Sequence, residues 1–359
     1  MKLKIMVAVA LLLIAASAWA ERPGNFRVIG PGGGGAMFHP TISPHDSNTV
    51  LIACDMSGSY ITHDGGGSWR MFNLRGVVDF FVFDPKDPKV MYAHATGLWR
   101  SRDGGEKWEL VYPSPSAVKG VRMNSDHSDE KILAEPDPLG DIAAMAIDPA
   151  NPRVFYVAAG SRDSAGLFTS RDAGESWQKV AALPDFPRHI WIDPRSSREA
   201  RTLYVASLKN LATVRGAARG TARGTTVDKV ELPKEASDIS LGFSADGPVV
   251  YVTSKDGLYI SRNISRDTSH DTSRDGGKTW QQAKLPGDGG HVRAVAASLE
   301  HPEIAYVSYN RLGLDGKKTG AMKKKEKELA VTWVRLRRMC GTRGLRRASV
   351  LPGVKILLR

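Results

Sequence analysis

Acidic side chains in loop settings are the residues of this chain whose types and spacing could support chemistry. The stretch from Tyr112 to Asp141 shows no strand pattern, and three of its acids and its histidine are the candidates: Asp126, His127, Asp129 and Glu130. Two carboxylates that flank a bond, one as acid and one as base or nucleophile, are what glycoside hydrolysis requires. Loops of about 30 residues without secondary structure are often functional. A solvated loop charge is the alternative interpretation for each acid.

An eight-residue pattern, S/T-x-D-x-G-x-x-W, indicates which elements would position these loops, because it occurs four times, beginning at Thr62, Ser101, Ser170 and Ser273. Asp followed closely by Gly suits a tight turn, since Asp accepts bonds from nearby backbone and Gly adopts positive φ. The Trp would begin the returning strand and anchor it in a core. We therefore expect turn-bonded aspartates and largely buried tryptophans, each within its own sheet: Asp64, Trp69, Asp103, Trp108, Asp172, Trp177, Asp275 and Trp280.

A second repeat, in which an apolar strand, a turn with Asp-Pro and another apolar strand follow one another, precedes these copies. Phe80–Phe83, Asp84-Pro85 and Val90–Tyr92 form one example. Pro is excluded from central strands, so these turns mark strand boundaries. The units begin near Ala36, Val77, Ile142, His189, Ile239 and Val292. Their spacing of about 40–65 residues fits four-stranded blades, so the sequence predicts an all-β propeller of about six to seven blades, each with its own small core.

The eight-residue pattern resembles the Asp-box, or BNR, repeat over roughly residues 25–310. That resemblance implies that each copy is the turn between the two outer strands of a blade and has a structural role. Sialidases share the repeat, but they need three arginines and a Tyr–Glu pair, and here only Phe26-Arg27 is similar to their entry motif. Sortilin-type receptors and photosystem assembly factors share it too and bind proteins without catalysis.

The first unit resembles the opening blade of the xyloglucan-degrading endoglucanases through Gly32–Gly35, His39-Pro40 and Val50–Tyr60. The resemblance implies that Asp55 is a catalytic carboxylate. The family pairs this Asp with another on a second propeller, for which this chain has no room. Ligand binding and capping of a turn remain alternative roles for Asp55. Asp126, Asp129 and Glu130 are the candidates for the partner acid.

Two other motifs indicate surface loops. Asp267, Asp271 and Asp275 recur every four residues, whereas calcium loops place ligands at every second residue, so no metal or cofactor is expected. The Arg/Gly run at Val214–Gly224 has no aromatic residue to stack on bases, so no nucleic-acid partner is expected.

The positive charge is confined to the C-terminal segment. Residues 317–359 hold 14 Lys/Arg and two Asp/Glu, whereas the rest of the chain has equal numbers of both. The repeat also stops there, since Trp333 has no Asp five residues before it. We expect residues 317–359 to be a poorly packed or disordered basic tail, either native or produced by a frameshift, that leaves the ring weakly closed beside the sixth unit.

Residues 1–20 have the pattern of a secretory signal peptide, with a basic start, an apolar run from Ile5 to Ala16 and Ala18-Trp19-Ala20. The run is short for a membrane span, so we expect a secreted or periplasmic protein without a span after cleavage. Cys54 and Cys340 form no disulfide framework. The expected divisions are the signal, a propeller at residues 21–316 and the tail.

The sequence therefore predicts a secreted, glycoside hydrolase-like propeller that acts on or binds a polysaccharide of the β-glucan type, with Asp55 as its candidate catalytic residue. A non-catalytic propeller that binds a protein or a glycan is the alternative. An acid facing Asp55 across roughly 5–10 Å would favour hydrolysis.

Overall fold

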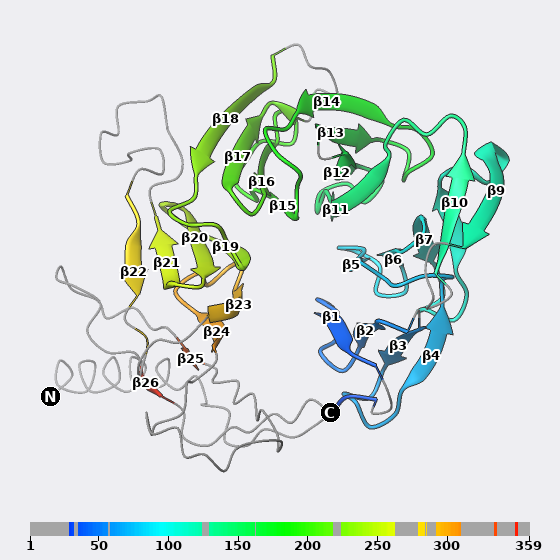
Figure 1. Cartoon of the computed structure of the whole chain (residues 1–359), viewed down its shortest axis with the longest axis horizontal. Coiled ribbons are helices and arrows are strands. Elements are labelled where there is room, and N and C mark those ends of the chain that lie inside the picture. Colours follow the sequence, from blue (N-terminus) through cyan, green and yellow to red (C-terminus); the bar gives the residue numbers. More distant parts are fainter. Residues whose placement is uncertain are drawn as a thin grey trace, which may run out of the picture.

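The structure, a computed structural model, describes residues 29–31, 35–56, 58–123, 129–161, 163–217, 224–262, 279–283, 285, 292–309, 334–335 and 349–350. These residues form antiparallel β-sheets and one short 3-10 turn, η1 (Pro115–Ala117). The sheets follow one another around a ring in chain order (Figure 1). No helix of the described residues is long and apolar enough to cross a membrane.

Five sheets are complete blades of four strands, paired in chain order from the innermost strand to the outermost. Blade 1 comprises β1 (Met37–Ile42), β2 (Val50–Cys54), β3 (Gly58–Thr62) and β4 (Arg70–Asn73). Blade 2 comprises β5 (Phe80–Phe83), β6 (Met91–His94), β7 (Leu98–Ser101) and β8 (Glu109–Tyr112). Blade 3 comprises β11 (Asp141–Ile147), β12 (Phe155–Ser161), β13 (Ser164–Ser170) and β14 (Gln178–Ala182). Blade 4 comprises β15 (His189–Ile192), β16 (Thr202–Ala206), β17 (Asn210–Arg215) and β18 (Thr226–Glu231). Blade 5 comprises β19 (Asp238–Ser244), β20 (Gly247–Ser254), β21 (Gly257–Ser261) and β22 (Gln281–Ala283).

The sixth sheet begins like the others but is reduced at its outer side. Strands β23 (Val292–Ala297) and β24 (Ala305–Tyr309) are full, whereas β25 (Val334–Arg335) and β26 (Ser349–Val350) have two residues each. The expected count of six to seven blades is therefore corrected to five complete blades and a partial sixth. The reason is that β25 pairs with β24 at only two positions, so the described residues provide no full outer hairpin. The signal at residues 1–20 and the rest of the tail lie outside the described residues.

The apolar cores lie between neighbouring blades, which corrects the expectation of one core inside each blade. A blade is a single sheet, so its apolar faces are buried only by the blades beside it. Strand β12 shows this, because Phe155 and Tyr156 point to opposite faces and both are fully buried. Phe155 joins a cluster shared with blade 2, and Tyr156 joins one shared with blade 4.

The turns divide the ring into two faces. In blade 2 the N–H of Gly104 donates to the carbonyl of Lys89 at 2.9 Å, and in blade 3 Ala173 donates to Arg153 at 2.9 Å. In these blades the eight-residue turn thus lies beside the turn between the first two strands, and we call this end the box face. The connections between second and third strands, and those between blades, lie at the other end, which we call the mouth face.

The described parts of the stretch from Tyr112 to Asp141 contain secondary structure, contrary to the expectation of a loop without it. They contain η1 and a hairpin of β9 (Val118–Met123) with β10 (Glu130–Ala134). Half-buried and exposed residues alternate along β10, as they do along a strand with one covered face. Asp126 and His127 lie between β9 and β10 in the sequence, outside the described residues.

Candidate functional site

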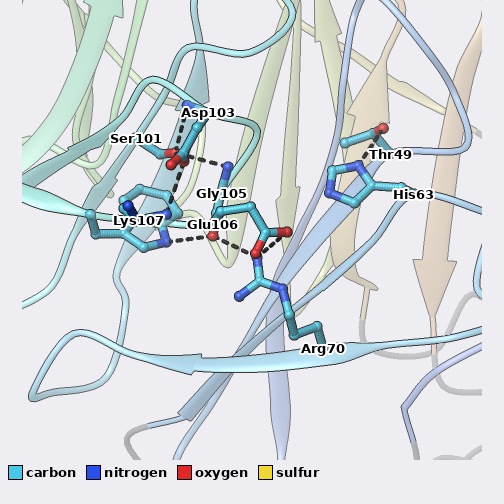
Figure 2. A network of polar contacts seen from close by, with 9 residues as sticks. Thr49, His63, Arg70, Ser101, Asp103, Gly105, Glu106 and Lys107 are labelled. Atoms are coloured by element: carbon cyan, nitrogen blue, oxygen red, sulfur yellow. Dashed lines mark hydrogen bonds and ion pairs between the residues drawn. The ribbon is translucent and has the colours of Figure 1, made fainter.

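The eight-residue turns bond to themselves in the same way in every described copy. In blade 2, Ser101 Oγ and the N–H of Lys107 both donate to Asp103 Oδ1 at 2.9 Å (Figure 2). The N–H of Gly105 donates to Ser101 Oγ at 2.8 Å. The Lys107 amide is the main cause that lowers the pKa of Asp103. The aspartate therefore acts as an anionic acceptor that closes the turn.

The copies in blades 1 and 3 repeat this geometry. Asp64 accepts the N–H of Ser68 at 2.9 Å, and Asp172 accepts the N–H of Ser176 at 2.9 Å. The Ser68 amide and hydroxyl are the largest causes that lower the pKa of Asp64. Asp275 of the fourth copy lies outside the described residues.

The tryptophans after these turns are half-buried, and those of blades 2 and 3 contact the preceding blade, whereas the sequence predicted largely buried anchors within each blade. Trp108 stacks on Phe72 of blade 1, with ring centroids 5.0 Å apart. Trp177 packs edge-on against Tyr112 of blade 2, with centroids 6.2 Å apart. Trp280 packs against the cluster shared by blades 4 and 5, and Trp69 donates from Nε1 to the carbonyl of Ile29 at 2.6 Å. The described turns thus join blades, and none of these contacts forms a chemical site.

Arg70, in the outermost strand of blade 1, also stabilises the junction between blades 1 and 2. Its Nη2 donates to the carbonyl of Gly105 at 2.6 Å and lies 3.5 Å from Glu106 Oε1 (Figure 2). These bonds hold the box face of blade 2 against the outermost strand of blade 1.

Asp55 lies on the mouth face, in the connection between β2 and β3. Its Oδ1 accepts the N–H of Ala36 at 2.8 Å, and its own N–H donates to the carbonyl of Ala36 at 3.1 Å. Gly35 has a φ of +89°, and a Cβ at this position would lie 2.5 Å from Asp55 Oδ1. Gly35 therefore lets the backbone approach the carboxylate closely. Among the described residues, no group bonds to Oδ2 of Asp55.

The two described candidates for the partner acid lie at the start of β10, beside a cavity that Asp55 does not line. Glu130 pairs with Arg75, whose Nε and Nη2 lie 2.5 and 3.0 Å from the carboxylate oxygens. The N–H of Glu130 also donates to the carbonyl of Arg75 at 2.9 Å. These bonds clamp the hairpin to the connection between blades 1 and 2. Asp129 and Glu130 therefore lie together at the cavity, and Asp55 does not line it.

The cavity has a volume of about 370 Å³ and lies on the mouth face, between blade 2, the hairpin and the start of β11. Its size is within the range of about 300–1,000 Å³ that is usual for small-molecule sites. One lysine, Lys131, lines it together with five carboxylates: Asp79, Asp129, Glu130, Asp137 and Asp141. Its lining is thus rich in hydrogen-bond acceptors.

Tyr112 and Asp137 form one fixed wall of this cavity. The Tyr112 hydroxyl donates to Asp137 and accepts the N–H of Leu139 at 3.0 Å. Asp137 also accepts the N–H of Gly140 at 3.1 Å. Burial, and secondly the bond to Asp137, raise the pKa of Tyr112. The phenol is therefore a neutral donor whose role is to hold the wall.

Asp79 and His94 also line the cavity. Asp79 Oδ2 lies 3.0 Å from His94 Nδ1, and the N–H of Asp79 donates to the carbonyl of His94 at 2.8 Å. The His94 ring stacks on Phe80, with centroids 5.3 Å apart and an interplanar angle of 12°. The pair is therefore fixed by backbone, ring and side-chain contacts together.

Several innermost strands begin with ionisable residues. Asp79 precedes β5, and Asp141, His189 and Asp238 are the first residues of β11, β15 and β19. Burial is the largest cause that lowers the pKa of His39 in β1; His189 lowers it further, while Asp79 and Asp238 act in the opposite direction. The sequence analysis missed this set. A signal was present in the sequence, because each of these residues lies at or beside a predicted unit start: Val77, Ile142, His189 and Ile239.

The described residues contain no group of three or more His, Cys, Asp or Glu side chains arranged to hold a metal ion. The triplet Asp267, Asp271 and Asp275, which the spacing analysis rejected as a calcium site, lies outside the described residues. The described chemistry of the mouth face is therefore that of carboxylates, histidines and hydroxyl groups.

Comparison with known proteins shows similarity to xyloglucanases. A xyloglucanase of Acetivibrio thermocellus is 28% identical over 193 residues, which cover 46% of this chain and 20% of that protein. A xyloglucanase of a Paenibacillus species is 28% identical over 191 residues, which cover 47% of this chain and 17% of that protein. The chain thus spans about a fifth of the length of these relatives.

A solved structure of an ancestral GH74 enzyme has a TM-score of 0.56 at 18% identity, and the match covers 87% of this chain and 38% of that chain. This likeness shows the β-propeller fold. No family model matches the chain.

Proposed function

We propose that this protein is a secreted, glycoside hydrolase-like propeller whose mouth face acts on or binds a β-glucan polysaccharide of the xyloglucan type. The observation that carries the proposal is the acceptor-lined cavity of about 370 Å³ on the mouth face of a chain similar to xyloglucanases. The signal-like pattern of residues 1–20 supports export to the periplasm or the medium.

The chemistry of the cavity is compatible with a sugar. Carboxylates accept hydrogen bonds only, whereas every hydroxyl of a saccharide can donate one. Bonds between a neutral hydroxyl and a charged acceptor are stronger than neutral ones. The glucan backbone and its side residues offer many such hydroxyl groups, so a wall of fixed carboxylates is a suitable surface for them.

Asp55 is the candidate catalytic residue of this proposal. It lies on the same face as the cavity, and Oδ2 is not bonded to any described residue. Its bond from Ala36 would hold the carboxylate in one orientation, as a catalytic base requires. A second acid within roughly 5–10 Å would have to complete the pair.

Non-catalytic binding is the second candidate, and a specific observation favours it. Oδ1 of Asp55 is bonded by the N–H of Ala36 and so holds the segment before β1, and Glu130 is neutralised by Arg75. A propeller with this mouth face would hold a glycan, or a protein partner, without cleaving a bond.

One experiment addresses both candidates. The purified chain is titrated with xyloglucan oligosaccharides by calorimetry and incubated with xyloglucan while the released reducing ends are measured, with amylose as the comparison polymer. Binding with release of reducing ends supports the hydrolase, and binding without release supports the binding propeller. No binding and no release would contradict both.

A further inference from the structure

We propose that Asp79 is the residue of the mouth-face cavity that contacts the saccharide, and that His94 is its positioning residue. This inference deepens the proposed function and rests on it. Asp79 and His94 come from blade 2, 15 residues apart in the sequence, and neither was identified from the sequence.

The first argument is that the other described acids of the cavity are engaged elsewhere. Glu130 is bound by Arg75, and Asp137 is bound by Tyr112 and Gly140. Asp129 also has a contact within the structure. Asp141 is at the rim, where its side chain is 76% exposed and 4.0 Å from Lys131 Nζ. A saccharide would have to displace an existing bond to reach either oxygen of Glu130 or Oδ1 of Asp137.

In Asp79, as in Asp137, a described residue bonds to only one of the two carboxylate oxygens. Oδ2 of Asp79 contacts His94, whereas Oδ1 bonds to no residue that the structure describes. Its side chain is 60% exposed, so the open oxygen is accessible to a ligand. An acceptor that is already oriented loses little conformational entropy when a ligand binds.

His94 supplies that orientation. Its side chain is only 11% exposed and its ring is stacked on Phe80, so the ring has little freedom to turn. The backbone bond from Asp79 to His94 fixes the two residues opposite each other. Nδ1 is therefore presented to Oδ2, and Oδ1 is directed away from this bond.

A second Asp–His pair at the start of an inner strand provides an internal comparison. His189 Nε2 lies 3.4 Å from Asp238 Oδ1. However, Asp238 accepts the N–H of Ile239 at 2.9 Å through Oδ1 and the N–H of Val295 at 3.0 Å through Oδ2. Asp238 thus links blade 5 to blade 4 through His189 and to the sixth sheet through Val295, so this pair has a structural role. Of these two pairs, only Asp79 retains an oxygen for a ligand.

Thr96 adds a second polar group to the lining of the cavity. Its Oγ1 is buried and has no hydrogen-bond partner in the structure, although the residue lines the cavity. Buried hydroxyls are normally bonded, to protein, water or ligand. Asp79 as an acceptor and Thr96 as donor and acceptor suit the adjacent hydroxyl groups of a sugar ring.

The test is calorimetric titration of the full chain with xyloglucan oligosaccharides. We expect Asp79→Ala to weaken binding at least tenfold, since a bond to a charged group is lost. His94→Leu keeps an apolar contact with Phe80 but removes the donor, and should weaken binding about fivefold. His94→Asn places an amide N–H near the position of Nδ1 and should restore affinity to within about threefold of the wild type.

The matched control is Glu303→Gln. Glu303 Oε1 lies 3.4 Å from His301 Nδ1, so this is also an acid–His pair, but it is on the box-face turn between β23 and β24. The substitution removes the same charge and should leave binding unchanged. Melting temperatures of all variants establish that affinity changes are not unfolding.

The double variant Asp79→Ala/His94→Leu separates positioning from an independent contact. If His94 acts through Asp79, the double variant binds no more weakly than Asp79→Ala alone. Wild-type affinity in Asp79→Ala, or a full additional loss in the double variant, would overturn the inference while leaving the proposed function intact. Absence of binding by the wild type would instead overturn the proposed function, and this inference with it.

Discussion

Arg201 and Asp148 form a bidentate ion pair that joins blade 4 to blade 3. Arg201 Nε lies 2.8 Å from Asp148 Oδ2, and Nη2 lies 2.7 Å from Oδ1. The two side chains are 4% and 6% exposed. Arg201 directly precedes β16, and Asp148 directly follows β11, so the pair ties the innermost strand of one blade to the second strand of the next.

Removing one partner of this pair should destabilise the ring strongly. Arg201→Met would leave a buried carboxylate without its cation, and such losses cost about 3–5 kcal/mol. Urea unfolding measures the change. The control is Glu231→Gln, because Glu231 pairs with the exposed Lys229 at 2.6 Å and a surface pair contributes about 0–1 kcal/mol. Equal effects of the two substitutions would contradict the interpretation.

Asp148 also predicts how stability depends on pH. Burial acts to raise its pKa, but the bonds from Arg201 and from the amides of Ala150 and Asn151 outweigh burial and lower it. Because the folded pKa is below the unfolded one, the stabilisation is complete above the ordinary value of 3.8 and is lost as the pH falls through the folded pKa.

Urea unfolding between pH 6 and 2.5 checks this sign. The wild type should lose stability below about pH 4, and Asp148→Asn should lose less over the same interval because this group no longer titrates. The same pH dependence in both proteins would show that Asp148 does not contribute.

The contact between Trp108 and Phe72 predicts that the box turns stabilise the junction between blades. Trp108→Ala should cost about 3 kcal/mol, the low end for a large aromatic side chain because the ring is half-buried. A double-mutant cycle with Phe72→Ala should give a coupling of about 0.5–1.5 kcal/mol. Strictly additive effects would mean that each ring is buried independently.

Asp55 can be tested by two substitutions that separate turn formation from chemistry. Asp55→Asn keeps an oxygen that can accept the Ala36 N–H, whereas Asp55→Ala removes it. If the residue is catalytic, Asp55→Asn abolishes release of reducing ends and leaves the melting temperature nearly unchanged. If it only closes the turn, Asp55→Asn behaves like the wild type and Asp55→Ala lowers the melting temperature.

The repeat architecture could be predicted from the sequence because its signals are local. Asp84 closes its turn by accepting the amides of Lys86 and Asp87, and Asp103 does the same in the eight-residue turn. Such bonds span two to four residues, so spacing alone identifies them. The predicted unit starts consequently lie within three residues of the observed first strands.

The candidate site could not be predicted because it depends on contacts between elements. Asp79 meets His94 only through the register of β5 with β6, and Glu130 meets Arg75 across 55 residues. Sequence spacing gives no such distances. The position of the cores between blades was missed for a similar reason. Strands such as β12, with Phe155 and Tyr156, carry large buried side chains on both faces, and the sequence does not say which neighbouring sheet covers each face.

Hydrogen–deuterium exchange with and without xyloglucan oligosaccharides tests the central claim, that the mouth face binds a β-glucan, most directly. The account predicts slower exchange in the cavity segments 76–79, 94–97 and 129–142, and unchanged exchange in the box-face turns 102–107 and 171–176. Protection confined to the box face, or no protection at saturating oligosaccharide, would contradict it.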